Sequence, residues 1–285
     1  MIDNTATQRD AAHDKQKGFR VAAIQMASGP SVAANLEEAA RLIEEAVAQH
    51  AKLVVLPEYF CIMGMKDTDK LAVREQPGDG QIQHFLSETA KRFGIWLVGG
   101  SVPLASTDPN KVFNSCLVYA DDGKLVARYD KIHLFGLQLG HERYAEEKTI
   151  KAGDKVVTVD SPFGRIGLSI CYDLRFPELF RLMNRVDIIL APAAFTAITG
   201  KAHWEVLVRA RAVENMAYVI APGQGGYHVN GRETNGDSMI VDPWGVVIDR
   251  LPRGSGAVVA TIDPEYQTSL RANLPALDHR ILQAC

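Results

Sequence analysis

Short, uninterrupted apolar runs are the feature that most constrains how this 285-residue chain can fold. They include Leu53–Leu56 (LVVL), Ile166–Ile170 (IGLSI) and Asp187–Ala191 (DIILA). A strand with one face in water alternates apolar and polar residues, so these runs predict strands that are covered on both faces. Between the first strands, residues 31–50 repeat apolar side chains at helical spacing. The pattern therefore predicts an α/β fold with helices on the outer faces of its sheets.

Hairpins interrupt this alternation of strands and helices. An Asp-Gly turn at residues 121–123 supplies the positive φ that tight hairpins require, and it joins Val112–Tyr119 to Leu125–Asp130. The other predicted hairpins join Val156–Val159 to Arg165–Ile170 and Ser238–Val241 to Val246–Asp249. Hairpins add antiparallel pairs, so we expect two mixed sheets that pack together and are flanked by helices. The remaining predicted elements are strands at 19–27, 95–98, 187–190 and 217–221 and helices at 82–92, 178–184 and 202–215.

The first eighteen residues differ in character from the rest of the chain. Residues 1–18 are polar, mixed in charge and without the apolar stretch of a signal peptide, which predicts a disordered tail. No linker interrupts the rest, so residues 19–285 are expected to form a single domain. No apolar run approaches the ~20 residues that a membrane span requires. We therefore expect a cytoplasmic protein without a membrane partner.

Composition excludes several other classes of function. Lys and Arg number 31 against 34 Asp and Glu, and no basic stripe is present, so we expect no nucleic-acid partner. The four cysteines are scattered without a CxxC pair, as in proteins of a reducing cytosol. No histidine pair has zinc-ligand spacing, and no helix with a third glycine follows Gly223–Gly226 to complete a dinucleotide fingerprint. We expect neither a metal nor another cofactor.

Three chemically capable residues each follow a predicted strand. Cys171 lies between IGLSI and a helix that begins near Pro177, Glu58 follows LVVL, and Lys131 follows Leu125–Asp130. Alone, each has an ordinary structural interpretation: a core cysteine, a solvated acid or a surface lysine. Together they could cleave an amide, with a thiolate attacking, a desolvated carboxylate moving the proton and a cation stabilising the oxyanion. Spacing alone leaves this joint interpretation open.

Two alternatives remain at this point. His133 lies two residues from Lys131, and residues two apart on a strand share a face, so a Cys-His hydrolase is the first alternative. The second is a catalytically inactive binding or scaffold protein with the same fold.

Longer motifs surround the three residues. They are LPEYF at Glu58, YDKIHLF at Lys131 and GLSICYDLRFPELFR at Cys171, followed by AFTAITGKAHWEVLVRARAVEN and MIVDPWG. With these motifs the chain resembles the nitrilase superfamily from Arg20 to about Arg280, in the branch that contains deaminated glutathione amidase and ω-amidase. The resemblance implies an α-β-β-α sandwich and a Glu-Lys-Cys triad.

The resemblance also implies residue roles. Cys171 would be the nucleophile that forms a thioester, Glu58 the general base and acid, and Lys131 the oxyanion stabiliser. The resemblance implies the Tyr172 backbone N–H as a second oxyanion donor. It implies Glu146 as a second glutamate, with Glu142 or Glu147 as alternatives. It also implies Arg175 as a clamp for a substrate carboxylate and Phe195 and Thr196 as pocket lining. An ion pair with Glu178 or Asp173 is the structural alternative for Arg175.

The substrate and the assembly follow from the same resemblance. We expect a small amide that carries a carboxylate, with deaminated glutathione first and ω-amides or N-carbamoyl compounds as alternatives. The branch reads HLFD and GHSM where this chain has Gly136 and Asp237, and we expect both departures at the pocket rim or a subunit contact. A homodimer is expected, with the apolar-rich segment Leu270–Leu282 as a possible interface.

Overall fold

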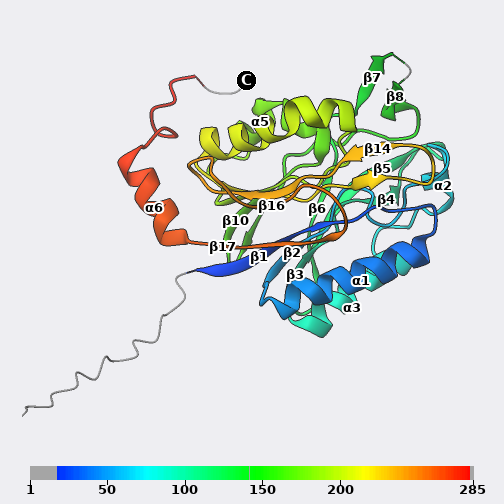
Figure 1. The fold of residues 1–285 in the computed structure, drawn as a ribbon, viewed down its shortest axis with the longest axis horizontal. Helices are drawn as coiled ribbons and strands as arrows, with labels where there is room; N and C mark the ends of the chain where they lie inside the picture. The colour runs from blue at the N-terminus through cyan, green and yellow to red at the C-terminus, as the bar shows by residue number, and fades with distance from the viewer. Residues whose placement is uncertain (1–17, 141, 283–285) are drawn as a thin grey trace, which may run out of the picture.

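The computed structural model describes residues 18–140 and 142–282. The predicted tail lies outside them except for Gly18, so it stays a prediction. Within the described residues the strands form two large sheets (Figure 1).

The first sheet has the order β17-β1-β2-β3-β5-β4, with β6 paired to β5. Its centre is parallel, and hairpin strands extend its edges. The strands are β1 (Phe19–Gln25), β2 (Leu53–Val55), β3 (Trp96–Val98), β4 (Val102–Ala105), β5 (Val112–Tyr119), β6 (Leu125–Asp130) and β17 (Gly256–Ile262). β17 was not predicted. It runs antiparallel to β1 in full register, from Phe19 opposite Ile262 to Gln25 opposite Gly256.

The second sheet has the order β16-β15-β12-β11-β10-β9. Its strands are β9 (Thr158–Ser161), β10 (Gly164–Leu168), β11 (Ile188–Leu190), β12 (Tyr218–Ala221), β15 (Ser238–Val241) and β16 (Val247–Leu251). β10, β11 and β12 are parallel, and antiparallel strands lie on both sides of them. Both sheets are therefore mixed, as predicted.

Helices cover the outer face of each sheet (Figure 1). α1 (Val32–Ala48) and α3 (Gln81–Phe93) cover the first sheet, and α4 (Pro177–Leu182) and α5 (Ala197–Asn215) cover the second. Alternate residues of β1 separate into two cores: Val21 and Ala23 pack between the sheets, while Ala22 and Ile24 pack beneath α1. Burial on both faces confirms the predicted α-β-β-α sandwich. The shared core between the sheets is also why we propose a single domain from residue 19 onwards.

Several elements differ from the prediction. α5 begins at Ala197 rather than at residue 202, because the Thr196 hydroxyl caps it by accepting a hydrogen bond from the Thr199 N–H at 3.3 Å. The strand predicted at 156–159 lies at β9, two residues later. Elements that were not predicted include two small hairpins and three short or terminal helices: β7 (Gly136–Leu139) with β8 (Glu142–Ala145), β13 (Gly225–Tyr227) with β14 (Glu233–Asn235), α2 (Asp69–Ala72), η2 (Cys171–Arg175) and α6 (Pro264–Asn273).

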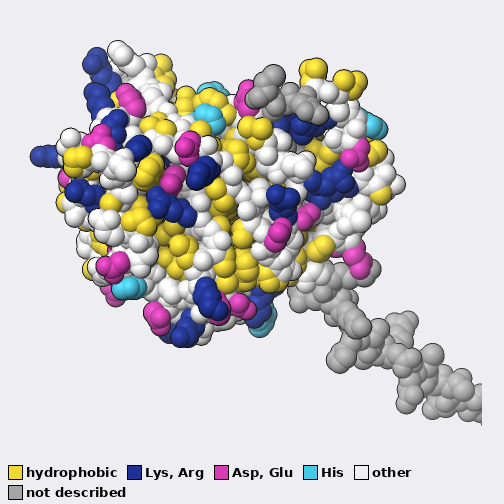
Figure 2. Space-filling model, turned by 180° about the vertical axis from the view of Figure 1, so that it is seen from behind, with side chains coloured by type: hydrophobic (Ala, Val, Ile, Leu, Met, Phe, Trp, Pro, Cys, Tyr) yellow, Lys and Arg dark blue, Asp and Glu magenta, His cyan; other side chains and the backbone are white. Residues whose placement is uncertain are grey.

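The surface seen from behind carries charges of both signs. Figure 2 shows Lys and Arg side chains interspersed with Asp and Glu, and apolar side chains between them. Among the described residues, no helix combines the length and hydrophobicity needed to cross a bilayer.

Candidate active site

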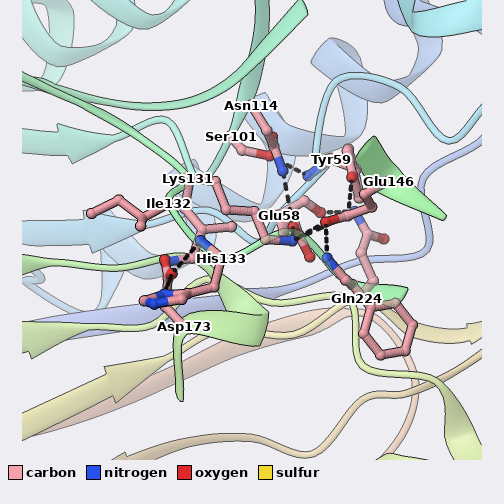
Figure 3. Close-up of polar contacts among 12 residues, drawn as sticks. Glu58, Tyr59, Ser101, Asn114, Lys131, Ile132, His133, Glu146, Asp173 and Gln224 are labelled. Carbon is pink, nitrogen blue, oxygen red and sulfur yellow. Dashed lines mark hydrogen bonds and ion pairs between the residues drawn. The ribbon is translucent and has the colours of Figure 1, made fainter. Parts of the chain in front are cut away.

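The ends of three strands bring Glu58, Lys131 and Cys171 to one place. Glu58 follows β2 in the first sheet, Lys131 follows β6 of that sheet, and Cys171 follows β10 in the second sheet. The Lys131 ammonium Nζ lies 2.8 Å from Glu58 Oε1, and both side chains are almost completely buried (Figure 3). All three residues line the same pocket or lie directly beneath it.

The turn that carries Glu58 is held from several directions. The Tyr59 N–H donates to the Ser101 hydroxyl at 2.9 Å, and the Gln224 side-chain amide donates to the Glu58 carbonyl at 3.0 Å. The Asn114 amide donates to Glu58 Oε1 at 3.0 Å. Gly100 passes so close that a Cβ there would lie 2.0 Å from the carbonyl oxygen of Pro57. The carboxylate is thus fixed by its neighbours.

Of the glutamates predicted as second glutamate, Glu146 contacts the lysine, while the side chain of Glu142 lies outside the described part of the structure. Glu146 Oε2 lies 2.8 Å from Lys131 Nζ, while Glu147 is exposed. The Phe135 N–H donates to the same Oε2 at 2.7 Å, and the Tyr59 hydroxyl donates to Oε1 at 2.7 Å. Lys131 is therefore held between two carboxylates, Glu58 and Glu146.

Cys171 occupies a strained position at the start of a short helix. Its φ is +51°, a left-handed conformation that residues with a side chain adopt at a cost and that recurs at functional sites. The 3-10 helix η2 begins at Cys171, and α4 begins at Pro177 as predicted. N–H groups in the first turn of a helix have no acceptor within the helix, and Tyr172 lies in the first turn of η2.

His133 belongs to a different cluster. Its Nδ1 lies 2.7 Å from Asp173 Oδ1, and its ring stacks on Phe176 with centroids 3.7 Å apart. Asp173 is fully buried and also accepts hydrogen bonds from the Tyr129 hydroxyl at 2.7 Å and the Ile170 N–H at 2.8 Å. The chain has left β6 before His133, so the expected shared face with Lys131 is absent (Figure 3).

Burial and charge shift the ionisation of the cluster. Burial raises the pKa of Glu58, and the charge of Glu146 raises it further, against the opposing effect of Lys131. Burial also raises the pKa of the Cys171 thiol, and the neighbouring Glu58 adds to this. Burial would raise the pKa of Glu146, but Lys131 reverses the direction and lowers it. Glu58 is therefore the carboxyl better suited to accept a proton.

A pocket with about 730 Å³ of empty space, partly open to solvent, lies over Cys171. Phe195 and Thr196 line it, as predicted. Arg175 also lines it, with its guanidinium over the Phe195 ring at 5.5 Å and hydrogen-bonded to His203 Nδ1 at 3.1 Å. Among the described residues no carboxylate lies within 4.0 Å of Arg175, so the ion pair considered with Glu178 or Asp173 is not formed.

Some residues of the site were missed in the sequence. Tyr59 and Asn114 contact the two glutamates, and Lys70 and Arg232 line the pocket. A polar side chain within the apolar strand VFNSCLVY was a usable signal for Asn114. Lys70 and Arg232 come from loops and short elements whose path the sequence does not indicate. Within the described residues, no group of three or more His, Cys, Asp or Glu side chains is arranged to hold a metal ion.

The two departures from the branch pattern lie outside the pocket lining. Gly136 begins β7, and Asp237 pairs with Arg250, whose Nε lies 2.8 Å from Asp237 Oδ1. Arg250 holds the carboxylate of Asp237 beside β16, and the expected pocket-rim or subunit contact stays a prediction for both positions.

The sequence is similar to curated proteins over most of its length. The carbon-nitrogen hydrolase family pattern matches residues 20–272. Deaminated glutathione amidase from Synechocystis sp. is 42% identical over 271 residues, 93% of this chain and 99% of that protein. Omega-amidase from Danio rerio is 36% identical over 265 residues, 92% of this chain and 94% of that protein.

Solved structures agree with these relatives. The NitFhit protein of C. elegans superposes with a TM-score of 0.87 at 37% identity, covering 93% of this chain and 66% of that chain. A Saccharomyces cerevisiae member of branch 10 of the nitrilase superfamily superposes with a TM-score of 0.83 at 34% identity, covering 93% and 97%. The chain therefore belongs to the carbon-nitrogen hydrolase family of the nitrilase superfamily, and it is a hydrolase of carbon–nitrogen bonds other than peptide bonds.

Proposed function

We propose that this protein is an amidase in which Cys171 attacks the amide carbon, with Glu58 as general base and acid and Lys131 as oxyanion stabiliser. The observation that carries the proposal is the buried Glu58–Lys131 ion pair beside a strained cysteine that opens onto a pocket. A proton acceptor, a fixed cation and a nucleophile are what thiol-dependent amide cleavage requires.

The first half-reaction forms a thioester. Cys171 Sγ bonds to the carbonyl carbon as Glu58 takes the thiol proton, and the carbonyl electrons move to oxygen. Lys131 Nζ and the Tyr172 N–H would stabilise that oxygen. Glu58 then returns the proton to nitrogen, the C–N bond breaks, and the amine or ammonia leaves.

The second half-reaction regenerates the enzyme. Glu58 removes a proton from water as the water oxygen bonds to the thioester carbon. The C–S bond then breaks, the thiolate recovers the proton from Glu58, and the carboxylic acid leaves. The raised pKa of Glu58 supports both proton transfers, because a carboxylate that holds a proton more tightly is a stronger base.

Glu146 is proposed as a positioning residue. It holds Lys131 at 2.8 Å and is itself held by the Phe135 N–H and the Tyr59 hydroxyl. Its charge keeps the lysine protonated: burial alone would lower the pKa of Lys131, but Glu146 and Glu58 raise it well above its ordinary value. A permanently charged lysine can stabilise the oxyanion without donating a proton to it.

The proposed substrate is a small amide with a carboxylate, as in deaminated glutathione. The 42% identity to deaminated glutathione amidase supports this choice, and the ω-amidase relative at 36% makes ω-amides the alternative. The guanidinium of Arg175 in the pocket pairs with no carboxylate of the described residues. This supports a carboxylate clamp, because a guanidinium can bind a carboxylate through two parallel hydrogen bonds.

The test is hydrolysis of a panel of amides by the purified protein and by its Cys171→Ala variant. The panel contains deaminated glutathione, ω-monoamides, N-carbamoyl compounds and uncharged analogues. We expect cleavage by the wild type and none by a folded Cys171→Ala protein, with mass spectrometry detecting an acyl adduct on Cys171 in the wild type alone. A folded variant that keeps substantial kcat/KM would refute the nucleophile. Tight binding of the amides without turnover would favour a binding protein.

Arg175→Met tests the clamp. Loss of a charged hydrogen-bonded contact should lower kcat/KM about tenfold to a hundredfold on carboxylate-bearing amides. Neutral amides should be little affected. An equal loss on both kinds of amide would mean that Arg175 supports the pocket wall instead.

We also propose a homodimer and a cytoplasmic location. Ile281 and Leu282 are largely exposed in the segment 270–282, as are Val206 on α5 and Trp244 beside it, and such side chains together favour burial against a second copy. The described cysteines are free, which supports a reducing compartment. Light scattering should give twice the mass of the chain, and a monomer at micromolar concentration would contradict the dimer.

A further inference from the structure

The active-site pocket holds more positive charge than the proposed chemistry uses. Its lining includes Lys70, Arg175 and Arg232, while Lys131 lies behind the lining, hydrogen-bonded to Glu58. Lys131 is held by two carboxylates, and Arg175 is the proposed clamp. Lys70 and Arg232 have no part in the mechanism derived above.

Within the part of the chain that the structure describes, Lys70 has no carboxylate partner. It lies on the short helix α2, and its Nζ donates a long hydrogen bond of 3.4 Å to the Thr149 hydroxyl. Its ammonium also lies 5.3 Å from the centroid of the Tyr59 ring. Among the described residues no carboxylate oxygen comes within 4.0 Å of it. Burial lowers the pKa of Lys70, and Arg232 and Lys131 act in the same direction against Glu146 and Asp67.

Arg232 adds to the positive charge near Lys70. It pairs with Asp67, and its guanidinium lies 5.3 Å from the centroid of the Tyr144 ring. Asp67 therefore forms its direct ion pair with Arg232 and acts on Lys70 only from a distance. Glu233 is the remaining acid of the lining outside the Glu58–Lys131–Glu146 cluster and Asp67.

Lys70 and Arg175, the two cations without a carboxylate partner among the described residues, lie on different parts of the pocket wall. Lys70 lies over the ring of Tyr59, the residue after Glu58, whereas Arg175 lies over the ring of Tyr172, the residue after Cys171. Lys70 belongs to the short helix α2, which follows β2 of the first sheet, and Arg175 to the 3-10 helix η2, which follows β10 of the second sheet. A ligand in the pocket therefore meets one cation on the glutamate side and another on the cysteine side.

We propose that Lys70 is a specificity-determining residue that binds a second carboxylate of the substrate, so that the pocket prefers amides with two carboxylates, one for Arg175 and one for Lys70. A dianion compensates both unpaired cations, while a monoanion leaves one of them without a counterion. The inference rests on the proposed amidase function and adds a second anion contact to it.

The test uses primary amides that share one carbon chain and differ in charge. Pentanamide has no carboxylate, glutaramate has one, and the terminal monoamide of propane-1,2,3-tricarboxylate has two. Ammonia release gives kcat and KM for the wild type, Lys70→Met and Arg175→Met. Lys66→Met is the matched control, because Lys66 is an exposed lysine four residues away and does not line the pocket.

We expect each added carboxylate to raise kcat/KM of the wild type, and Lys70→Met to remove one of these two increments, about tenfold to a hundredfold. All three rates of Lys66→Met should stay within about threefold of the wild type, whereas Lys70→Met should lower the rate on the dicarboxylate far more than the rate on pentanamide. Arg175→Met should remove the other increment.

Other outcomes separate this inference from the proposed function. If Lys70→Met lowers all three rates by one factor, or if the wild type does not favour the dicarboxylate, the second contact is wrong while the amidase stands. If Lys66→Met matches Lys70→Met, the effect is long-range attraction and the contact is again wrong. If the wild type releases no ammonia from any amide of either panel, the proposed function itself fails.

Discussion

Replacing Lys131 by Gln tests the centre of the proposed mechanism. The ammonium is completely buried and lies 2.8 Å from both Glu58 and Glu146. Gln keeps a hydrogen-bond donor of similar shape but removes the charge that would face the developing oxyanion. Loss of one oxyanion donor costs about 3–4 kcal/mol, so kcat should fall roughly 10²–10³-fold with a smaller change in KM.

The same variant has a second consequence, for stability. Removing one partner of a buried ion pair typically costs about 3–5 kcal/mol, because the remaining charge stays buried. Here the pKa of Glu58 and of Glu146 should both rise once the cation is gone, since Lys131 lowers each of them. A carboxyl with a raised folded-state pKa destabilises the protein above its ordinary pKa, and the penalty disappears as pH falls. The stability loss should therefore be larger at neutral than at acidic pH.

The assay combines steady-state ammonia release with thermal melts at several pH values. His133→Gln is the matched control, since Gln can still reach Asp173 and the ring of His133 stacks on Phe176 away from the lysine. We expect His133→Gln to keep kcat within about tenfold. A folded Lys131→Gln with near-normal kcat, together with an inactive His133→Gln, would refute the triad and restore the Cys-His alternative.

Three further variants probe how the site is held. In Glu146→Gln the acidic limb of the kcat/KM profile should move to lower pH, because the negative charge of Glu146 raises the pKa of Glu58; an unchanged or higher limb would contradict this. Gly100→Ala should lower the melting temperature and the activity together, since its Cβ would lie 2.0 Å from the Pro57 carbonyl oxygen in a backbone with φ of +45°; a neutral effect in melts would show that the turn relaxes. Asp173→Asn weakens charge-assisted hydrogen bonds worth about 1.5–3 kcal/mol each, so denaturant unfolding should reveal a loss of this order, and an unchanged free energy of unfolding would contradict this.

Much of the fold follows from local sequence patterns. The runs LVVL and DIILA are buried on both faces in β2 and β11, and the residues 31–50 form α1 with a Ser31 cap. These elements were predictable for two reasons. A strand buried on both faces needs apolar side chains throughout, and a helix buried on one side repeats apolar residues at helical spacing. The hairpin β7–β8 was missed because surface strands carry little of either signal, whereas β17 was missed although most of its residues are buried.

The sequence alone also singled out the residues that we propose to carry the chemistry. Glu58, Lys131 and Cys171 each stand out as a reactive side chain directly after a strand, and their motifs identify the family. The sequence did not indicate the distances between these three residues. Residue 58 approaches residue 131 only because β2 and β6 join one sheet, and residue 171 approaches both only because the second sheet packs on the first. Packing likewise places Glu146 against Lys131 and His133 against Asp173, which the sequence did not indicate.

Tertiary structure alone decided the electrostatics. The spacing of charged residues in the sequence does not reveal that Asp67 forms an ion pair with Arg232. Nor does it reveal that Lys70 and Arg175 have no carboxylate partner among the described residues. The sequence also does not reveal the left-handed backbone of Cys171, because no glycine adjoins this residue to indicate a turn. Local periodicity reports which way a side chain faces, whereas ion pairing and desolvation depend on distances between segments that only the packed sheets bring together.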